Sequence, residues 1–300
     1  MKRRAFIRNL AVATTLPLLG APMRAGAAET ASPPGKLRVL SCNVRVDLAP
    51  DTRTGNGWAH RRELCGDVIA SRKADLIGFQ EVHPAHLSYL SERLKEFEVF
   101  ALYNPGKTPL PSNAIFFRRD KFKLVSSGGF WLSETPHVAG SKSWGTANCR
   151  FANWVELTER NTGKPLRFWN THLDHVSQAA RENAARLLVE AGSPFPENLA
   201  QILTGDMNAA SNNIAIQKLK ESGWKDTYEA VHGPKDPGFT AHGFLGVNAP
   251  AKRPDGSEKS RIDWIFTRGP LKATGAEVIR DAKEGRYPSD HFFMLADLTF

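Results

Sequence analysis

Short apolar runs alternate with longer segments of helical spacing between residues 37 and 300. The runs are bounded by Gly, Pro and Asn, as strands are, and they lie at 37–45, 74–81, 113–119, 122–133, 152–159, 166–174, 201–208, 261–268 and 291–300. Apolar residues three or four apart indicate helices at 58–73, 84–97 and 177–190, the last with Ser177 as its N-cap. Strands with helices between and beside them predict a layered α/β fold with two sheets packed face to face.

Polar residues occur close to the ends of several predicted strands. Strand side chains alternate between two faces. The residues that share a face are Asn43 with Arg45, Asn170 with His172 and Asp174, and Asp206 with Asn208. Glu81 closes 74–81, Asp263 lies within 261–268, and Asp290 and His291 stand at the start of the last strand. Polar groups at the ends of several strands are typical of a catalytic crevice on an α/β scaffold.

Each of these residues also has an ordinary structural explanation. Asp206 and Asn208 could form an Asx turn, Asp263 could pair with Arg261, and Glu81 could stabilise the start of a helix. Taken singly, such roles are the commoner ones for polar residues near strand ends. The occurrence of the whole set on strand after strand favours a site.

The first 27 residues have the composition of an export signal. Arg3 and Arg4 stand side by side before a short apolar stretch, and Ala25 and Ala27 flank a glycine in the small-x-small arrangement of a cleavage site. The paired arginines predict a twin-arginine signal and a periplasmic or secreted product. The stretch is too short to span a bilayer, which needs about 20 apolar residues, so we expect no integral membrane association.

Removal of this segment changes the charge of the chain. Residues 1–27 contain five basic and no acidic residues, which leaves 35 basic and 31 acidic residues and a formal charge of +4. A mildly basic protein suits an anionic substrate, but it lacks the strong positive face of a tight duplex binder. We therefore expect a small phosphorylated substrate, with nucleic acid as the alternative. The composition does not indicate an oligomeric state.

We do not expect the cysteines to form a disulfide framework. Cys42, Cys65 and Cys149 are an odd number in an exported chain. Twin-arginine substrates fold in a reducing cytoplasm, where disulfides are rare. We expect all three to be small packing residues.

The segment NTHLDH at 170–175 raises the question of a metal. His172, Asp174 and His175 match the H-x-D-H part of the metallo-β-lactamase pattern, which binds Zn²⁺. That pattern needs a histidine where Asn170 stands, and it leaves the other motifs unexplained. The competing interpretation makes His172 a phosphate contact and gives His175 no role.

Six segments together resemble the endonuclease/exonuclease/phosphatase family of metal-dependent phosphoesterases. They are CNVR with Asn43, GFQE with Glu81, NTHLDH with His172, TGDMN with Asp206 and Asn208, RIDWIF with Asp263, and SDHF with Asp290 and His291. The segments follow the family's order from Leu37 to the C-terminus. A looser likeness to an exported bacterial branch rests on NGWAHRREL, FWLSETP, SKSWG, CRFANWVEL and THLDHVSQAAR. The domain organisation then expected is a signal peptide at 1–27, a short linker at 28–36 and a single family domain at 37–300.

The resemblance implies a four-layer α/β sandwich of two mixed sheets with helices outside, as in DNase I. It also implies a divalent metal, Mg²⁺ with Mn²⁺ able to replace it, held by Glu81 with help from Asn43 and Asp290. Oxygen ligands of this kind suit Mg²⁺ better than Zn²⁺. The reaction implied is hydrolysis of a phosphate mono- or diester by in-line attack of water.

The remaining roles also follow from the resemblance. Asp206 is the implied base and Asn208 orients the attacking water. His172 and His291 donate hydrogen bonds to the phosphoryl oxygens, while Asp263 holds His291 in the donating tautomer and raises its pKa.

Arg150 stands where relatives place a phosphate contact, but it could equally pair with a neighbouring carboxylate. Less favoured alternatives for the whole chain are a zinc hydrolase and a binding module that kept the fold without the chemistry.

Overall fold

The computed structural model describes residues 32–105, 110 and 112–300, and the expected signal peptide lies outside them. The strands of the first sheet are β1 (Lys36–Asn43), β2 (Leu76–Gln80), β3 (Phe97–Ala101), β4 (Ala114–Arg118), β11 (Lys272–Ile279) and β12 (Phe293–Thr299). Those of the second are β5 (Phe122–Trp131), β6 (Phe151–Glu159), β7 (Pro165–His172), β8 (Ala200–Asp206), β9 (Lys225–Asp226) and β10 (Asp263–Arg268). The helices are α1 (Ala49–Arg53), α2 (Trp58–Ser71), α3 (Pro84–Arg93), α4 (Gln178–Gly192), α5 (Ile214–Glu221) and α6 (Thr227–His232), with a 3₁₀ turn, η1, at Gly246–Asn248.

Both sheets have six strands and are mixed. The first has the order β11-β12-β1-β2-β4-β3, and the second has the order β5-β6-β7-β8-β10-β9. In the first sheet β1 runs parallel to β2 and antiparallel to β12. In the second sheet β7 runs parallel to β8, which is antiparallel to β10. The strands that end in the expected site residues therefore lie in the middle of their sheets.

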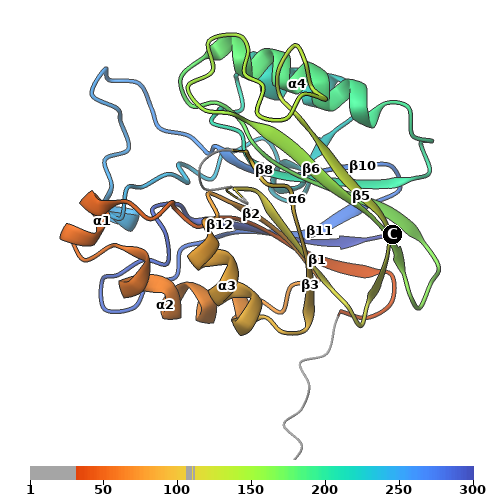
Figure 1. Cartoon of the computed structure of the whole chain (residues 1–300), viewed down its shortest axis with the longest axis horizontal. Helices are drawn as coiled ribbons and strands as arrows, with labels where there is room; N and C mark the ends of the chain where they lie inside the picture. The colour runs from red at the N-terminus through yellow and green to blue at the C-terminus, as the bar shows by residue number, and fades with distance from the viewer. Residues whose placement is uncertain (1–31, 106–109, 111) are drawn as a thin grey trace, which may run out of the picture. The chain divides into compact units, whose positions relative to one another are not determined.

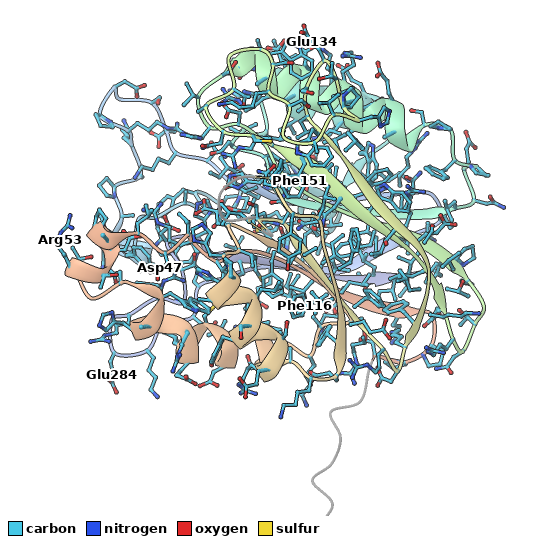
Figure 2. The ribbon with its side chains drawn as sticks, viewed as in Figure 1. Asp47, Arg53, Phe116, Glu134, Phe151 and Glu284 are labelled. Atoms are coloured by element: carbon cyan, nitrogen blue, oxygen red, sulfur yellow. The ribbon has the colours of Figure 1, made fainter. Side chains whose placement is uncertain are left out.

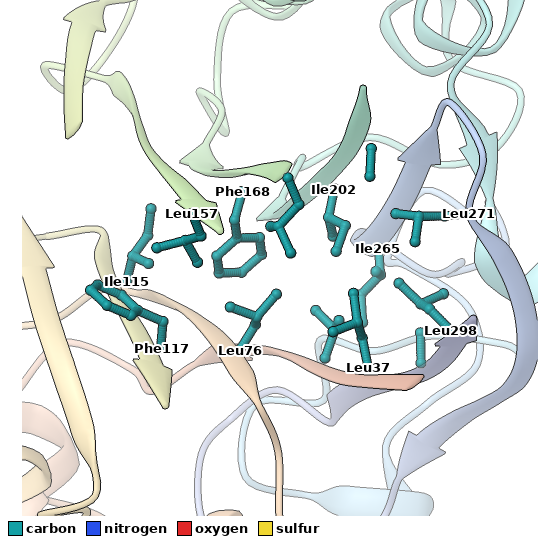
Figure 3. Packing of buried hydrophobic residues seen from close by; sticks show 14 of the residues in the cluster. Leu37, Leu76, Ile115, Phe117, Leu157, Phe168, Ile202, Ile265, Leu271 and Leu298 are labelled. Carbon is teal, nitrogen blue, oxygen red and sulfur yellow. The ribbon is translucent and has the colours of Figure 1, made fainter. Parts of the chain in front are cut away.

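The two sheets face each other across an apolar core, which Figure 3 shows from close by. Leu37, Leu76 and Ile115 of the first sheet pack against Phe168 and Ile202 of the second. Outside the first sheet α2 and α3 cover a second core, and outside the second sheet α4 and α5 cover a third (Figure 1). The structure thus has the four layers that the sequence predicts, and Ser177 caps α4 by accepting from Ala180 N at 3.1 Å.

Polar side chains join the sheets where the core approaches the site. Asn170 donates from Nδ2 to the Phe79 carbonyl at 2.7 Å, and its Oδ1 accepts from Gln80 Nε2 at 2.7 Å and from Thr204 Oγ1 at 3.1 Å. A methyl group on Gly78 would lie 2.0 Å from Thr204 Oγ1. Glycine at position 78 is therefore required by the close approach of the sheets.

Gly78→Ala should destabilise the protein by about 3 kcal/mol, since overpacking of a core costs 1–3 kcal/mol and a displaced buried hydrogen bond adds to that cost. Urea unfolding measures the change. Adding Thr204→Ala to Gly78→Ala should restore part of the stability, because it removes the atom nearest to the new methyl group. Equal destabilisation of the single and double variants would show that the contact with Thr204 is not the cause.

Residues 32–36, expected to be part of a linker, are fastened to the domain. The buried Lys121 ammonium donates to the carbonyl groups of Ser32 and Lys36 and pairs with Asp75 at 3.2 Å. Gly35 N donates to Glu159 Oε1 at 3.1 Å. The contacts of the domain therefore begin before Leu37.

The prediction misses three strands, and all three lie at sheet edges. β3, β9 and β11 border on only one other strand each. Residues 84–97 were expected to be one helix, but α3 ends at Arg93 and Phe97 begins β3.

Within residues 32–105, 110 and 112–300 there is no helix that is long and apolar enough to cross a membrane.

Candidate active site

The strand ends that carry polar residues meet at one edge of the packed sheets. Asn43, His172 and Asp206 are the last residues of β1, β7 and β8, and Glu81 directly follows β2. Asp263 is the first residue of β10, and the register pairs it with Asp206, which is paired on its other side with His172. Strand alternation turns Asn43, His172, Asp206 and Asp263 toward the space between the sheets.

A cavity of about 580 Å³ opens at this edge, within the size range of small-ligand sites. Of the residues expected in the site, those that line it are Glu81, Arg150, His172, Asp206, Asn208 and His291. Asn43, Asp263 and Asp290 lie behind this lining and contact it. The structure therefore brings the whole expected set together.

Asp206 is the centre of the hydrogen-bond network. Its Oδ2 accepts from Asn43 Nδ2 at 3.0 Å, and its Oδ1 accepts from Asn208 N at 2.9 Å. Burial and the negative charge of Asp263 raise the pKa of Asp206 to about 7, although the charge of His291 opposes the shift. A carboxylate with a pKa near neutrality is well matched to accept a proton from water at physiological pH.

His291 and Asp263 form a buried pair. Asp263 Oδ2 lies 2.8 Å from His291 Nδ1, while His291 Nε2 faces the cavity 3.9 Å from Asp206 Oδ2. Burial alone would lower the pKa of His291, but the charge of Asp263 and its hydrogen bond outweigh burial and raise this pKa well above the ordinary value. Arg261, the other expected partner of Asp263, pairs instead with Asp226.

His172 is held in a neutral form that differs from its expected role. Asn208 Nδ2 donates to the Leu173 carbonyl at 3.1 Å and lies 3.0 Å from His172 Nε2, and Asp206 Oδ2 lies 3.3 Å from the same ring nitrogen. Burial, followed by the charge of Arg150, lowers the pKa of His172 well below its ordinary value. In this geometry Asn208 and Asp206 both contact Nε2, so donation to a phosphoryl oxygen would require the ring nitrogen to leave them.

Three residues that line the cavity have left-handed backbone conformations. The φ angles are 56° at Arg45, 62° at Glu81 and 45° at Asn208. Each such conformation costs about 1–3 kcal/mol for a residue other than glycine and is typical of functional sites. Arg45 N is held by Asn43 Oδ1 at 2.9 Å, just as Asn208 N is held by Asp206. The strain turns the side chains that follow β1, β2 and β8 into the cavity.

Glu81 accepts two hydrogen bonds. Its Oε1 accepts from Asn43 Nδ2 at 3.1 Å and its Oε2 accepts from Val46 N at 2.8 Å. Burial opposes ionisation of Glu81, but these bonds and the charge of His291 outweigh burial and lower its pKa. Asn43 thus presents its NH₂ group to Glu81 and Asp206, while its oxygen accepts from Arg45 N. This differs from the expected oxygen-ligand role of Asn43, which would require the amide to turn its oxygen away from Arg45.

Asp290 lies beside an arginine that was absent from the expected site. Its Oδ2 is 3.4 Å from Arg45 Nη1, and Arg45 also pairs with Asp51 at 2.8 Å. Burial raises the pKa of Asp290, and the charge of His291 opposes that shift. Arg45 lines the cavity and adds a positive charge next to the carboxylates.

Arg150 also reaches the cavity, and burial lowers its pKa. Its Nε lies 3.9 Å from Asp174 Oδ2, beyond hydrogen-bond distance, and its Nη2 lies 3.2 Å from His175 Nδ1. The paired interpretation of Arg150, in which it neutralises a carboxylate, therefore has weak geometric support.

The sequence model described as the Endonuclease/Exonuclease/phosphatase family matches residues 40–291. The chain belongs to the endonuclease/exonuclease/phosphatase family. The chain is similar in structure to the mannosyl-6-phosphatase of Bacteroides thetaiotaomicron, with a TM-score of 0.77 and 29% identity over 88% of this chain and 100% of that one. A family member from Bacteroides vulgatus has a TM-score of 0.78 and 27% identity, over 88% and 99% of the two chains.

Among curated proteins, human tyrosyl-DNA phosphodiesterase 2 is 24% identical over 256 residues. The match covers 81% of this chain and 64% of the human protein. As a member of this family the chain is a metal-dependent phosphoester hydrolase with the DNase I-like fold.

The donor set of this family member fits a hard divalent cation. Among the described residues, two sets of three side chains each bring their ligand atoms within 4.8 Å of one another. One set is Glu81, His172 and Asp206, and the other is Asp206, Asp263 and His291. The charge of Glu81 contributes to the raised pKa of both Asp206 and Asp290. Crowded carboxylates are stabilised by a bound cation, and carboxylate oxygens are the ligands that Mg²⁺ prefers. Among the described residues, Asp290 falls outside both sets.

The H-x-D-H segment does not form a zinc site. The Asp174 carboxylate accepts from Ser177 N at 2.8 Å and from Thr146 Oγ1 at 2.8 Å, and these bonds outweigh burial and hold its pKa well below the usual range. Asp174 therefore holds the turn before α4, although it shares a strand face with His172. His175 lies next to Arg150, so the three residues of the segment do not converge.

Arg61, in the segment NGWAHRREL, supports the site from behind. It is buried and donates to the carbonyl groups of Val44 at 2.6 Å, Arg45 at 2.7 Å and Pro288 at 3.0 Å. These bonds connect the turn after β1 to the segment that carries Asp290. Asp47 in the same turn accepts from Trp58 N at 3.0 Å and lies near α1 in Figure 2.

Proposed function

We propose that the protein is an exported enzyme that hydrolyses a phosphate mono- or diester of a small metabolite or head group with Mg²⁺, which Mn²⁺ can replace. The observation that carries the proposal is the placement of a raised-pKa carboxylate, Asp206, beside a protonated His291 in the wall of one cavity, with Asp206 Oδ2 3.9 Å from His291 Nε2. In-line attack on phosphorus uses a base for the attacking water and a charged donor for the phosphoryl oxygens, and this pair supplies both.

Each side chain then has a defined task. Asp206 takes the proton of the attacking water, and the amide of Asn43 keeps its Oδ2 oriented. His291 donates from Nε2 to a phosphoryl oxygen, and Asp263 keeps the ring charged. Asn208 and His172 restrict the position of Asp206 and of the water.

Two features of the site would balance the charge of the phosphate. Arg150 presents its guanidinium at the cavity, and Glu81 with Asp290 would hold the metal. When bound, Mg²⁺ neutralises phosphate charge in the transition state.

Two observations support a small substrate. Residues 28–300 have a formal charge of only +4, and the Bacteroides mannosyl-6-phosphatase is named for a phosphorylated sugar. Duplex DNA binding relies on several phosphate contacts from basic residues. Export by the twin-arginine route to the periplasm or medium is part of the same proposal and is supported by the sequence of residues 1–27.

The test is a hydrolysis screen of hexose phosphates, nucleotides, glycerophosphodiesters and plasmid DNA with Mg²⁺ or Mn²⁺. We expect chelator-sensitive release of phosphate or alcohol from a small ester, and no such release by an Asp206→Asn blank prepared in parallel. Plasmid nicking at physiological salt that outpaces every small ester would favour the nuclease alternative, consistent with the name of the human relative.

A further inference from the structure

Arg150 is oriented toward the cavity by a neutral partner. Within the described part of the chain, the hydrogen bond of its guanidinium is the one to His175 Nδ1, at 3.2 Å, and its buried Nε has no acceptor. The carboxylate nearest to it, Asp174, is already saturated by other donors. Because an arginine is always charged, Nδ1 must be the acceptor, and the remaining N–H groups of Arg150 stay available at the cavity wall.

The backbone around His175 is fixed although its side chain is exposed. Asp174 accepts from Val176 N at 3.0 Å, and Arg181 Nη1 donates to the Asp174 carbonyl at 2.8 Å. Ser177 Oγ donates to the Trp144 carbonyl at 2.6 Å. The ring therefore projects from a rigid turn, which is the requirement for a side chain that positions another one.

We propose that His175 is a positioning residue that holds Arg150 for the phosphoryl group of the substrate, an inference that rests on the proposed function. A carboxylate in this place would neutralise the guanidinium and weaken its attraction for phosphate. A neutral imidazole nitrogen fixes the orientation and adds no negative charge to that of Asp206 and Asp174, which already act on the guanidinium.

The test compares two substitutions that differ in the acceptor. His175→Asn places an amide oxygen close to the position of Nδ1, and His175→Leu removes the acceptor. For His175→Leu we expect the Kd of inorganic phosphate, measured by calorimetry with Mg²⁺, and the KM each to rise roughly tenfold, as for the loss of a hydrogen bond to a charged group. His175→Asn should stay near wild type, and kcat should change less than KM. His60→Leu, on the exposed side of α2, is the matched control.

A double-mutant cycle separates positioning from a structural role. If His175 acts through Arg150, His175→Leu has no further effect on the Kd of phosphate in an Arg150→Met background. Additive effects, or a His175→Leu variant that matches wild type, would overturn the inference. Equal losses in folded His175→Asn and His175→Leu proteins would also overturn it. A wild-type protein that neither binds phosphate nor hydrolyses any ester would instead reject the proposed function, and this inference with it.

Discussion

Glu81→Gln is expected to lower kcat/KM by about a thousandfold or more while the protein stays folded. A metal at this site contributes several kcal/mol of charge stabilisation to the transition state, and about 1.4 kcal/mol corresponds to a factor of ten in rate. Glu81 is half-buried and the pKa of its carboxyl group is lowered, so it supplies a full negative charge at neutral pH. Glutamine keeps the size of the side chain and removes that charge.

The hydrogen bonds of Glu81 add to the effect. Both oxygens are acceptors, one from Asn43 Nδ2 and the other from Val46 N. Glutamine has one acceptor and one donor, so one of these contacts becomes a donor facing a donor. The turn that holds Arg45 in its left-handed conformation should therefore loosen as well.

Metal binding in the absence of substrate is the decisive measurement. Wild-type protein should gain thermal stability as Mg²⁺ or Mn²⁺ is added, since a ligand that binds the folded state raises Tm by mass action. The variant should lose this gain. Glu134→Gln serves as the control, because it changes an exposed glutamate in the loop that follows β5 (Figure 2). A Glu81→Gln protein that keeps both the gain in Tm and turnover at low Mg²⁺ would remove Glu81 from the metal.

The central part of the site could be predicted because it follows from strand alternation. Asn43, His172 and Asp206 each end a buried strand whose apolar residues show which face is inside. Counting in twos from those residues places the polar side chains between the sheets. The missed strands β3, β9 and β11 lie at sheet edges, where one side lacks a neighbouring strand. Burial there is partial, and the apolar pattern is correspondingly weak.

Hydrogen-bond direction could not be predicted from residue type. An asparagine can offer an oxygen or an NH₂ group, and Arg45 N decides which end of Asn43 faces Glu81. The Leu173 carbonyl accepts from Asn208 Nδ2 and thereby fixes the NH₂ group of Asn208 on the side of His172. Both decisions depend on backbone groups whose positions exist only in the folded chain. The sequence places Arg45 on the same strand face as Asn43, but its contact with Asp290 spans 245 residues of sequence.

Asp263→Asn is expected to lower kcat by about 10²- to 10⁴-fold, the range found for acid/base groups and for residues that fix a tautomer. Asp263 Oδ2 lies 2.8 Å from His291 Nδ1, and Asp263 is fully buried. Asparagine can still form a hydrogen bond with the ring, but it no longer stabilises the imidazolium. His291 then loses the charge with which it donates to the phosphoryl oxygen.

The direction in which the pH profile of kcat shifts follows from the charge that the substitution removes. A negative charge stabilises the protonated form of its neighbours, so Asp263 raises the pKa of both His291 and Asp206. Activity falls on the alkaline side as His291 loses its proton, and the substitution should move that limb to lower pH. Activity rises on the acid side as Asp206 loses its proton, and that limb should also move to lower pH.

Rate profiles of kcat, together with an NMR titration of the His291 ring, measure both shifts, with Asp255→Asn on an exposed loop as the control. The affinity for Mg²⁺ in the absence of substrate should barely change, because the proposed metal carboxylates are Glu81 and Asp290. The opposite pattern, in which Mg²⁺ binding is lost and the profile keeps its position, would place Asp263 and His291 at the metal. Asp206, Asp263 and His291 do offer ligand atoms within 4.8 Å of one another, so this measurement decides between two arrangements that the geometry allows. The raised pKa of His291 favours the donor role, because an imidazolium carries a proton on both ring nitrogens and has no lone pair for a cation.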